Sequence, residues 1–396
     1  METTTVKAHG LDGSLTEPDW PPLTLAELRT LFLRFSQLGE PVEIAFVSPR
    51  PLSAAGMVRT RQGMVFVKRH ARSVRDAAGL REEHRFMAHL RAKGAQVPRV
   101  LADGAGETAV ELCDWTYEVH EPAAGVDLYR DAISWTPFFC AAHARQAGET
   151  LANLHRAAEG FAAPRREVQP LVASFTIFAV QNPGAQLEKY LQARPLLAEH
   201  ASVRKCAVEA LDLLEPFHAE LRPLLADLPA LWTHNDLHPS NLLWSGPGED
   251  ARAAAAIDFG LADRTNAVHD LASAIERSMV GWLELVAHPD RPEDLAVHLD
   301  HMAALLDGYT SVRRLSEAEA AALAPMTALC HAEFALSEAD YFLGALHAEE
   351  RARMAYDGWL VGHARWFHGA AGTRLLDAIR QWERSRAHRS AGVEPR

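Results

Sequence analysis

The 396-residue sequence lacks several features that would assign it quickly to a structural class. Its four cysteines are far apart and form no C-x-x-C pair: Cys113, Cys140, Cys206 and Cys330. This spacing excludes a disulfide framework and a cysteine zinc ribbon, and it fits a reducing compartment. The N-terminal residues have no apolar core of signal-peptide length. The uncharged segment 170–187 is interrupted by Gln-Asn-Pro-Gly and leaves an apolar part too short to span a bilayer. We therefore expect a soluble, cytoplasmic protein.

Positive charge is also scarce. The chain has 40 Lys and Arg against 52 Asp and Glu, a formal net charge of −12, and only five of the basic residues are lysines. Nucleic acids and anionic membranes are bound through basic patches, so neither is expected as a partner. No internal repeat is visible. The 48% of apolar and 23% of charged residues are typical of globular proteins, and the length suffices for two or three core-bearing units.

The remaining pattern changes along the chain. Residues 1–22, polar and with three prolines, and 384–396 are predicted to be flexible ends. Between them, 23–121 mixes helical periodicity with short apolar runs, whereas 122–383 is mostly helical. We expect an α+β fold with a small antiparallel lobe followed by a larger helical lobe. The predicted strands of the small lobe are 42–47, 57–60, 64–67, 97–102 and 116–119, and its helices 23–38 and 80–90.

One β-rich segment interrupts the helical part, at 231–260. It begins LWTHNDLHPSNLLW, makes a turn at 245–248, and continues with a second apolar strand that ends in Asp258-Phe259-Gly260. A hairpin of this kind places Asp236, Asn241 and Asp258 at the same end. Their oxygen donors suit magnesium better than zinc. Any one of these residues is also an ordinary turn former, but together they match the catalytic loop and metal loop of kinases.

A lysine and a glutamate upstream complete this pattern. Lys68 ends the apolar strand 64–67, and Glu83 lies in the helix LREEHRFMAHL, one turn before its packed face. The neighbouring Glu82 points away and is expected in solvent. A Lys68–Glu83 ion pair would hold the ammonium against nucleotide phosphates. The simpler interpretation of Lys68 is a surface residue on a strand edge.

These motifs resemble the aminoglycoside phosphotransferase and choline kinase superfamily of small-molecule kinases. The resemblance covers about 40–370 and is specific only at HNDLHPSNLL and AIDFGLADRTNAVHDLA. It implies a two-lobed, protein-kinase-like fold that uses ATP and Mg²⁺ to phosphorylate a hydroxyl group of a small molecule. By this likeness Asp236 orients or deprotonates the acceptor hydroxyl, and Asn241 and Asp258 bind magnesium.

The same resemblance implies roles for the remaining site residues. Lys68 and Glu83 would grip the phosphates, and the backbone of the segment 117–121, including Val119 and Glu121, would bind adenine. His234 and Asp270 would support the catalytic loop. The simpler interpretation of Asp270 is a helix N-cap, and the two roles are compatible.

Two positions depart from the family pattern. The loop 48–56 lacks the G-x-G-x-x-G of protein kinases, so phosphates would be held by backbone N–H groups of 52–56 and by Ser53. Asn235 replaces the glycine that commonly follows the catalytic-loop histidine, and asparagine tolerates the left-handed conformation expected there.

Other functions remain open from the sequence alone. The alternation His234-x-Asp236-x-His238 allows a zinc hydrolase, although no third histidine cluster with ligand spacing accompanies it. A protein Ser/Thr kinase of the bacterial stress-response type and a non-catalytic ATP-binding regulator are further alternatives. The acceptor is not named by the sequence. Candidates for contacting it are Arg264, Glu276, Trp282, Glu284, Asp340, Tyr341, Tyr356 and Trp359.

Overall fold

A computed structural model of the chain describes residues 18–132, 135–282 and 295–391, with side chains as far as 386. The predicted flexible segment 1–22 lies outside this range up to residue 17, and so do Glu284 and residues 392–396. The described chain forms two compact units. Of the described residues, unit 1 comprises 18–132 and 240–259, and unit 2 comprises 135–239, 260–282 and 295–391. The chain therefore passes between the units three times.

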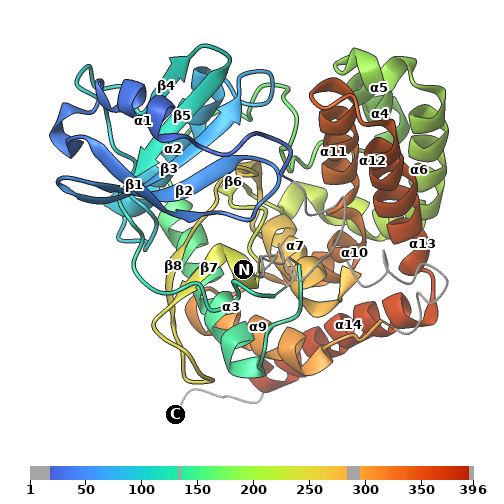
Figure 1. The fold of residues 1–396 in the computed structure, drawn as a ribbon. Helices are drawn as coiled ribbons and strands as arrows, with labels where there is room; N and C mark the ends of the chain where they lie inside the picture. The colour runs from blue at the N-terminus through green and yellow to red at the C-terminus, as the bar shows by residue number, and fades with distance from the viewer. Residues whose placement is uncertain (1–17, 133–134, 283–294, 392–396) are drawn as a thin grey trace, which may run out of the picture. The chain divides into compact units, whose positions relative to one another are not determined.

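Unit 1 is built on a five-stranded antiparallel sheet of order β1-β2-β3-β5-β4 (Figure 1). A separate hairpin, β7–β8, belongs to the same unit. The predicted strand at 97–102 is wrong, because that segment makes only an isolated bridge between Val100 and His120. Its place in the sheet is taken by β4, which was not predicted. The elements are α1 (Leu25–Phe32), η1 (Ser36–Leu38), β1 (Pro41–Val47), β2 (Ala54–Thr60), β3 (Gly63–Ala71), α2 (Ala77–Ala92), β4 (Ala109–Leu112), β5 (Trp115–His120), β7 (Leu242–Trp244) and β8 (Ala253–Ala256).

The alternation of side chains in β3 and β5 separates two faces of the sheet. Val67 and Val119 point to one face, where they form an apolar core with Leu28 and Leu31 of α1. The residues next to them in the chain, Lys68 and Glu118, pair directly across the two strands and point to the other face, toward α2. The sheet thus presents its charged groups on the α2 side.

Unit 2 is mostly helical, with one short antiparallel pair, β6–β9. Helices α3 and α9 lie side by side and approach closely, because glycines face the partner backbone at Gly148 and Gly308. Residues 384–391, predicted as part of a flexible tail, belong to α14. The elements are α3 (Ala141–Ala158), α4 (Pro183–Gln192), α5 (Pro195–Glu199), α6 (Ala201–Leu221), η2 (Arg222–Asp227), β6 (Ala230–Thr233), β9 (Asp263–Asn266), α7 (Ala267–Met279), α9 (Leu299–Val312), α10 (Glu317–Leu329), α11 (Ala332–Gly344), α12 (Glu349–Arg353), the π-helix η5 (Met354–Gly362), α13 (His363–Trp366) and α14 (Ala370–Ala391).

The predicted α+β fold is confirmed: an antiparallel sheet forms from the N-terminal part and helices dominate the C-terminal part. Within the described residues, no helix combines the length and the apolar character needed to cross a membrane.

Candidate functional site

The β7–β8 hairpin brings two predicted metal ligands to one end of unit 1. Leu242 pairs with Ala256, and the N–H of Ile257 donates to the carbonyl of Asn241 at 2.9 Å. Asn241 therefore precedes the hairpin, and Asp258 follows it, at the same open end. Asp258 has a positive φ of 62°, which turns the chain sharply away from the strand. A carboxylate and an amide oxygen at one end are a donor set that fits Mg²⁺.

Lys68 lies at this open end of the hairpin. Its Nζ is 3.0 Å from Asp258 Oδ1. Burial alone would lower the pKa of the Lys68 ammonium, but the charges of Asp258, Glu118 and Glu83 outweigh burial and raise it. The lysine is therefore held as a cation among carboxylates. Glu83 is buried at 3% exposure whereas Glu82 is partly exposed, as the predicted helix face requires.

An arginine that the sequence analysis missed also lies at this end of unit 1. Arg50 is in the loop between β1 and β2, and its guanidinium donates to the carbonyl of Ser240 at 3.0 Å. Burial lowers the pKa of Arg50, and the charges of Asp258 and Asp127 oppose this shift. Arg50 is the single basic residue in SPRPLSAAG, the loop predicted to hold phosphates, and this could have identified it as a candidate. The nearby Ser53 is buried and directly precedes β2.

The strand end predicted to bind adenine has its named backbone groups engaged. The carbonyl of Val119 accepts from the N–H of Leu101 at 2.7 Å, and the N–H of Glu121 donates to the carbonyl of Arg99 at 2.9 Å. The N–H of Glu121 could serve a base only by giving up its bond to Arg99, whereas the carbonyl of Val119 keeps a second lone pair. A nucleotide would therefore have to use that lone pair or other backbone groups of this strand end.

In unit 2, the loop that carries Asp236 is held by a buried carboxylate. Asp270 accepts from the N–H of His234 and of Asn235, both at 2.8 Å, and its Oδ2 lies 3.0 Å from His155 Nε2. Burial alone would raise the pKa of Asp270, but these hydrogen bonds and the neighbouring histidines lower it. Asp270 is not the helix N-cap; that position is taken by Asn266, whose side chain accepts from the N–H of His269.

The conformation of this loop depends on the residue after His234. Asn235 has φ 61°, the left-handed conformation expected there, and its side chain fixes it: Oδ1 accepts from Thr233 Oγ1 at 2.8 Å and Nδ2 donates to the carbonyl of Leu261 at 3.2 Å. The N–H of Asp236 then donates to His234 Nδ1 at 3.2 Å. The loop is thus rigidly placed within unit 2.

Asp236 itself pairs with an arginine that the sequence analysis did not single out. Arg277 on α7 donates to Asp236 Oδ1, and its guanidinium lies over the rings of Phe334 and Trp135, at 4.7 and 5.3 Å from the centroids. Burial lowers the pKa of Arg277 to about 10, so it stays charged at neutral pH. Arg277 follows Asp270 by two helical turns and shares its face of α7, a signal that was present in the sequence.

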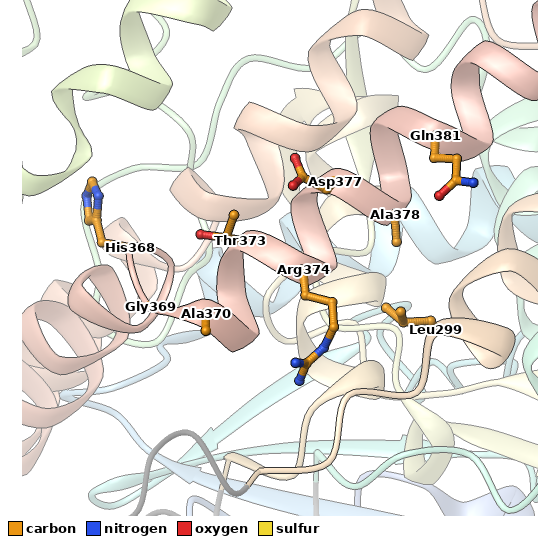
Figure 2. A pocket seen from close by; sticks show the side chains of 9 residues that line it. All are labelled: Leu299, His368, Gly369, Ala370, Thr373, Arg374, Asp377, Ala378 and Gln381. Atoms are coloured by element: carbon orange, nitrogen blue, oxygen red, sulfur yellow. The ribbon is translucent and has the colours of Figure 1, made fainter.

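The remaining acceptor candidates are distributed over unit 2. Glu276 and Trp282 are buried beside Arg277, with Trp282 Nε1 donating to the carbonyl of Glu276 at 2.8 Å. Asp340, by contrast, lies 3.8 Å from Arg194. A surface pocket formed along α14, with Arg374 and Asp377 on its wall, includes none of the predicted site residues (Figure 2).

Comparisons with known proteins relate the chain to kinases. Residues 57–315 match the model of a phosphotransferase enzyme family. A homoserine kinase of Methylobacterium radiotolerans is 30% identical over 238 residues, which are 60% of this chain and 62% of that protein. The chain thus spans about six-tenths of the length of the curated relatives it matches.

Two solved structures share the fold. A microcompartment-associated aminopropanol kinase has a TM-score of 0.54 and 17% identity, covering 87% of this chain and 99% of its own. A spectinomycin phosphotransferase solved with ADP and spectinomycin has a TM-score of 0.51 and 11% identity, covering 92% of this chain and 99% of its own. At these identities the likeness concerns the fold.

Proposed function

Because the chain belongs to the phosphotransferase enzyme family, we propose that it is a kinase that transfers the γ-phosphate of Mg–ATP to a hydroxyl group of a small molecule. The observation that carries the proposal is the Lys68–Asp258 ion pair at the open end of the β7–β8 hairpin. It joins a fixed cation to an oxygen-donor pair, the combination that phosphoryl transfer requires. The similarity to homoserine kinases supports a small hydroxyl-bearing acceptor.

Unit 1 carries the groups for the nucleotide. Asn241 and Asp258 would hold Mg²⁺, which when bound neutralises charge on the β- and γ-phosphates. When the nucleotide binds, Lys68 would give up part of its ion pair with Asp258 and contact phosphate oxygens instead. Arg50, which is half-buried, adds a second cation close enough for the charge of Asp258 to stabilise it. Glu83, buried on α2, contributes a negative charge that keeps Lys68 protonated.

Unit 2 carries the group for the acceptor. Asp236 would accept the hydroxyl proton late in the transfer, because a loose transition state needs orientation more than a strong base. Its orientation is set by Arg277, by its own N–H bonded to His234, and by Asp270 behind the loop. An acceptor of the amino alcohol, aminoglycoside or sugar class is proposed, since such compounds present a hydroxyl beside polar groups.

The test is the variant Asp236→Asn, which keeps the shape of the side chain and removes its charge. We expect affinity for Mg–ATP to stay within a few-fold while turnover falls by roughly 10²–10⁴-fold. Acceptors would first be found by incubating the wild type with ATP and a panel of amino alcohols, hydroxy amino acids, sugars and aminoglycosides, scored by product mass.

Three results would contradict the proposal. Turnover retained by Asp236→Asn would show that this residue only forms a turn, where asparagine substitutes well. Full activity in the presence of a magnesium chelator would remove the metal assignment. Transfer to protein acceptors, with none to the small molecules, would favour a protein kinase instead.

A further inference from the structure

Three buried side chains from distant parts of the chain meet in unit 2, beside Arg277. Glu276 is on α7, His331 precedes α11, and His363 begins α13. His363 Nε2 is 3.3 Å from Glu276 Oε1, and His331 Nδ1 is 3.6 Å from Glu276 Oε2. The two imidazole rings are nearly parallel, with centroids 4.5 Å apart. Each residue turns a potential ligand atom toward the other two.

Burying these polar groups without hydrogen-bond partners destabilises the fold. Their exposed fractions are 1% for Glu276, 4% for His331 and 3% for His363. Among the residues that the structure describes, neither carboxylate oxygen and none of the four ring nitrogens has a hydrogen-bond partner of normal geometry. Leaving one buried polar group unsatisfied costs about 1–3 kcal/mol, and buried polar groups in proteins are generally paired. Six such atoms in one place call for a bound species.

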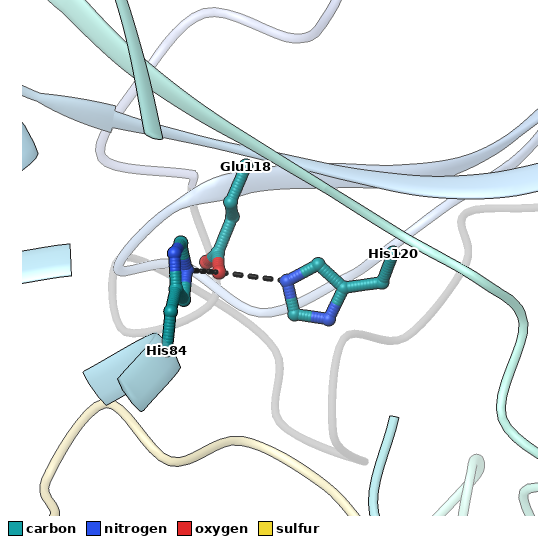
Figure 3. A group of neighbouring side chains, drawn as sticks. All are labelled: His84, Glu118 and His120. Carbon is teal, nitrogen blue, oxygen red and sulfur yellow. Dashed lines mark hydrogen bonds and ion pairs between the residues drawn. The ribbon is translucent and has the colours of Figure 1, made fainter. Parts of the chain in front are cut away.

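A second histidine–glutamate cluster, in unit 1, shows the contrast. Glu118 Oε2 is bonded to His84 Nε2 at 2.9 Å and to His120 Nε2 at 2.7 Å (Figure 3). Its other oxygen is bonded to His70 at 3.0 Å, and His84 Nδ1 to Thr108 Oγ1 at 2.9 Å. Histidines that each donate one N–H to the carboxylate satisfy this cluster, so it does not require an ion.

We propose that Glu276, His331 and His363 bind a divalent transition-metal ion of the zinc class. Zinc bound at about 2.0–2.1 Å in tetrahedral geometry separates neighbouring ligand atoms by about 3.3 Å. The measured separations of 3.3 and 3.6 Å are of this order and too long for strong hydrogen bonds, but each runs to a different oxygen of Glu276. Because a metal lies in the plane of the imidazole that binds it, one of the two parallel rings would turn when the ion binds. Two imidazoles and one carboxylate are also an established donor set for zinc, with room for a fourth ligand.

The surrounding charges are compatible with a cation. Arg277 Nε is 3.9 Å from Glu276 Oε2, but the charge of Arg277 is balanced by its ion pair with Asp236. Burial raises the pKa of Glu276 to about 7, so near neutral pH its carboxyl gives up a proton readily when a cation binds. Burial lowers the pKa of both His331 and His363 to about 3, so both rings are neutral, the form that binds metals.

Such an ion would connect α7, α11 and α13 at the residue next to Arg277. It would thereby stabilise the helix segment that positions Asp236, as a structural site rather than as a participant in phosphoryl transfer. The inference does not depend on the proposed kinase activity, because binding of the metal can be measured directly.

The experiment uses the full chain without a histidine tag, stripped with a chelator and returned to metal-free buffer. Titration with Zn²⁺ against a chromophoric competitor should give one site per chain with a Kd of micromolar or below. Co²⁺ should give the intense visible absorption of a tetrahedral site. Zn²⁺ should also raise the melting temperature, as any ligand specific for the folded state does.

The variants His331→Gln and Glu276→Gln should each weaken zinc binding by roughly 100-fold or more. His120→Gln, in the hydrogen-bonded cluster of unit 1, is the matched control and should leave zinc affinity unchanged. Circular dichroism checks that each variant folds. If His331→Gln does not fold, the zinc affinity of Glu276→Gln and the cobalt spectrum of the wild type test the proposal instead.

The proposal is overturned if the wild type binds no zinc at concentrations of tens of micromolar, or if His120→Gln is the variant that loses it. It is equally overturned if primary amines raise the melting temperature while Zn²⁺ and Co²⁺ do not. That last result would assign the cluster to an ammonium group.

Discussion

At the scale of single residues, the charged groups of the site are held by partners that the motifs do not contain. Arg277 pairs with Asp236. Arg50 donates a hydrogen bond to the carbonyl of Ser240, and the charge of Asp258 stabilises its guanidinium. The motif residues could be identified from spacing alone, because the kinase pattern fixes their order. The two arginines had only weak signals in the sequence, and their partners could not be named from it, because those contacts join segments far apart in sequence.

The Lys68 and Glu83 assignments lead to a first prediction. In Lys68→Met the phosphates would lose their fixed cation, so turnover should fall by roughly 10²-fold, the cost of misplaced reactants. Glu83→Gln should act in the same direction but less strongly, because its charge is one of several that raise the pKa of Lys68. Steady-state kinetics with the identified acceptor checks this. Glu82→Gln, at the partly exposed neighbour, is the control, and a larger effect there would show that the wrong glutamate was chosen.

A second prediction at this scale concerns acid stability. Burial lowers the pKa of His269 to about 4, opposed in part by Asp270 and aided by Arg165. The unfolded chain takes up this proton near pH 6.5, whereas the folded chain does not until about pH 4. The contribution of His269 to the free energy of unfolding is therefore complete above pH 6.5. It decreases by about 3 kcal/mol as the pH falls from 6.5 to 4.

The variant His269→Gln isolates this contribution. Denaturant unfolding of both proteins between pH 7.5 and 4 should show a steeper loss of stability for the wild type. Parallel curves for the two proteins would mean that His269 is protonated in the folded state or is solvated there.

At the scale of the element, the packing of α3 on α9 depends on two glycines. A Cβ at Gly308 would lie 2.1 Å from the carbonyl oxygen of Arg145, and one at Gly148 would lie 2.0 Å from that of Leu305. Both contacts are with backbone atoms, which cannot rotate away. Gly308→Ala should therefore force the helices apart and destabilise the protein by about 1–3 kcal/mol.

Thermal and urea unfolding measure this prediction. Gly358→Ala, in the π-helix η5, is the control because a Cβ there meets nothing within 4 Å. That change should be neutral or stabilising by up to about 1 kcal/mol, since alanine restricts the unfolded chain. Equal melting temperatures for Gly308→Ala and the wild type would show that the two helices adjust without cost.

The elements also show what periodicity can and cannot predict. The strands around Lys68 and the β7–β8 hairpin followed from apolar runs separated by turn residues. The strand β4, with sequence AVEL, was missed because Glu111 interrupts its short apolar run. The π-helix η5 has no periodic signature of its own and was predicted as ordinary helix.

At the scale of the whole molecule, the division into two units separates the groups that the motif lists together. Asn241, Asp258 and Lys68 belong to unit 1, and Asp236 and Asp270 to unit 2. The sequence could order these residues along the chain, but it could not show that the unit boundary falls between Pro239 and Ser240. That boundary depends on long-range contacts rather than on composition.

This division predicts which part of the chain a bound nucleotide should stabilise. A non-hydrolysable ATP analogue with Mg²⁺ should protect amides of β3 and of the β7–β8 hairpin against hydrogen exchange, because ligand binding favours the folded form of the unit that binds it. Amides of α3 and α9 should change much less. Protection confined to α3 and α9 would place the nucleotide in unit 2 and contradict the assignment of Lys68 and Asp258.

The hairpin also has a consequence for how the protein is made. Trp244 is fully buried in unit 1, bridged to Val126 and close to Tyr129, yet the ribosome adds it more than a hundred residues after them. During translation, unit 1 therefore cannot complete its core when residue 134 has been added. The surface around Tyr129 stays exposed until residues 240–259 have been synthesised, after part of unit 2. Nascent chains paused before residue 240 should accordingly be the ones that chaperones hold, and no single cut of the gene separates the two units into self-sufficient halves.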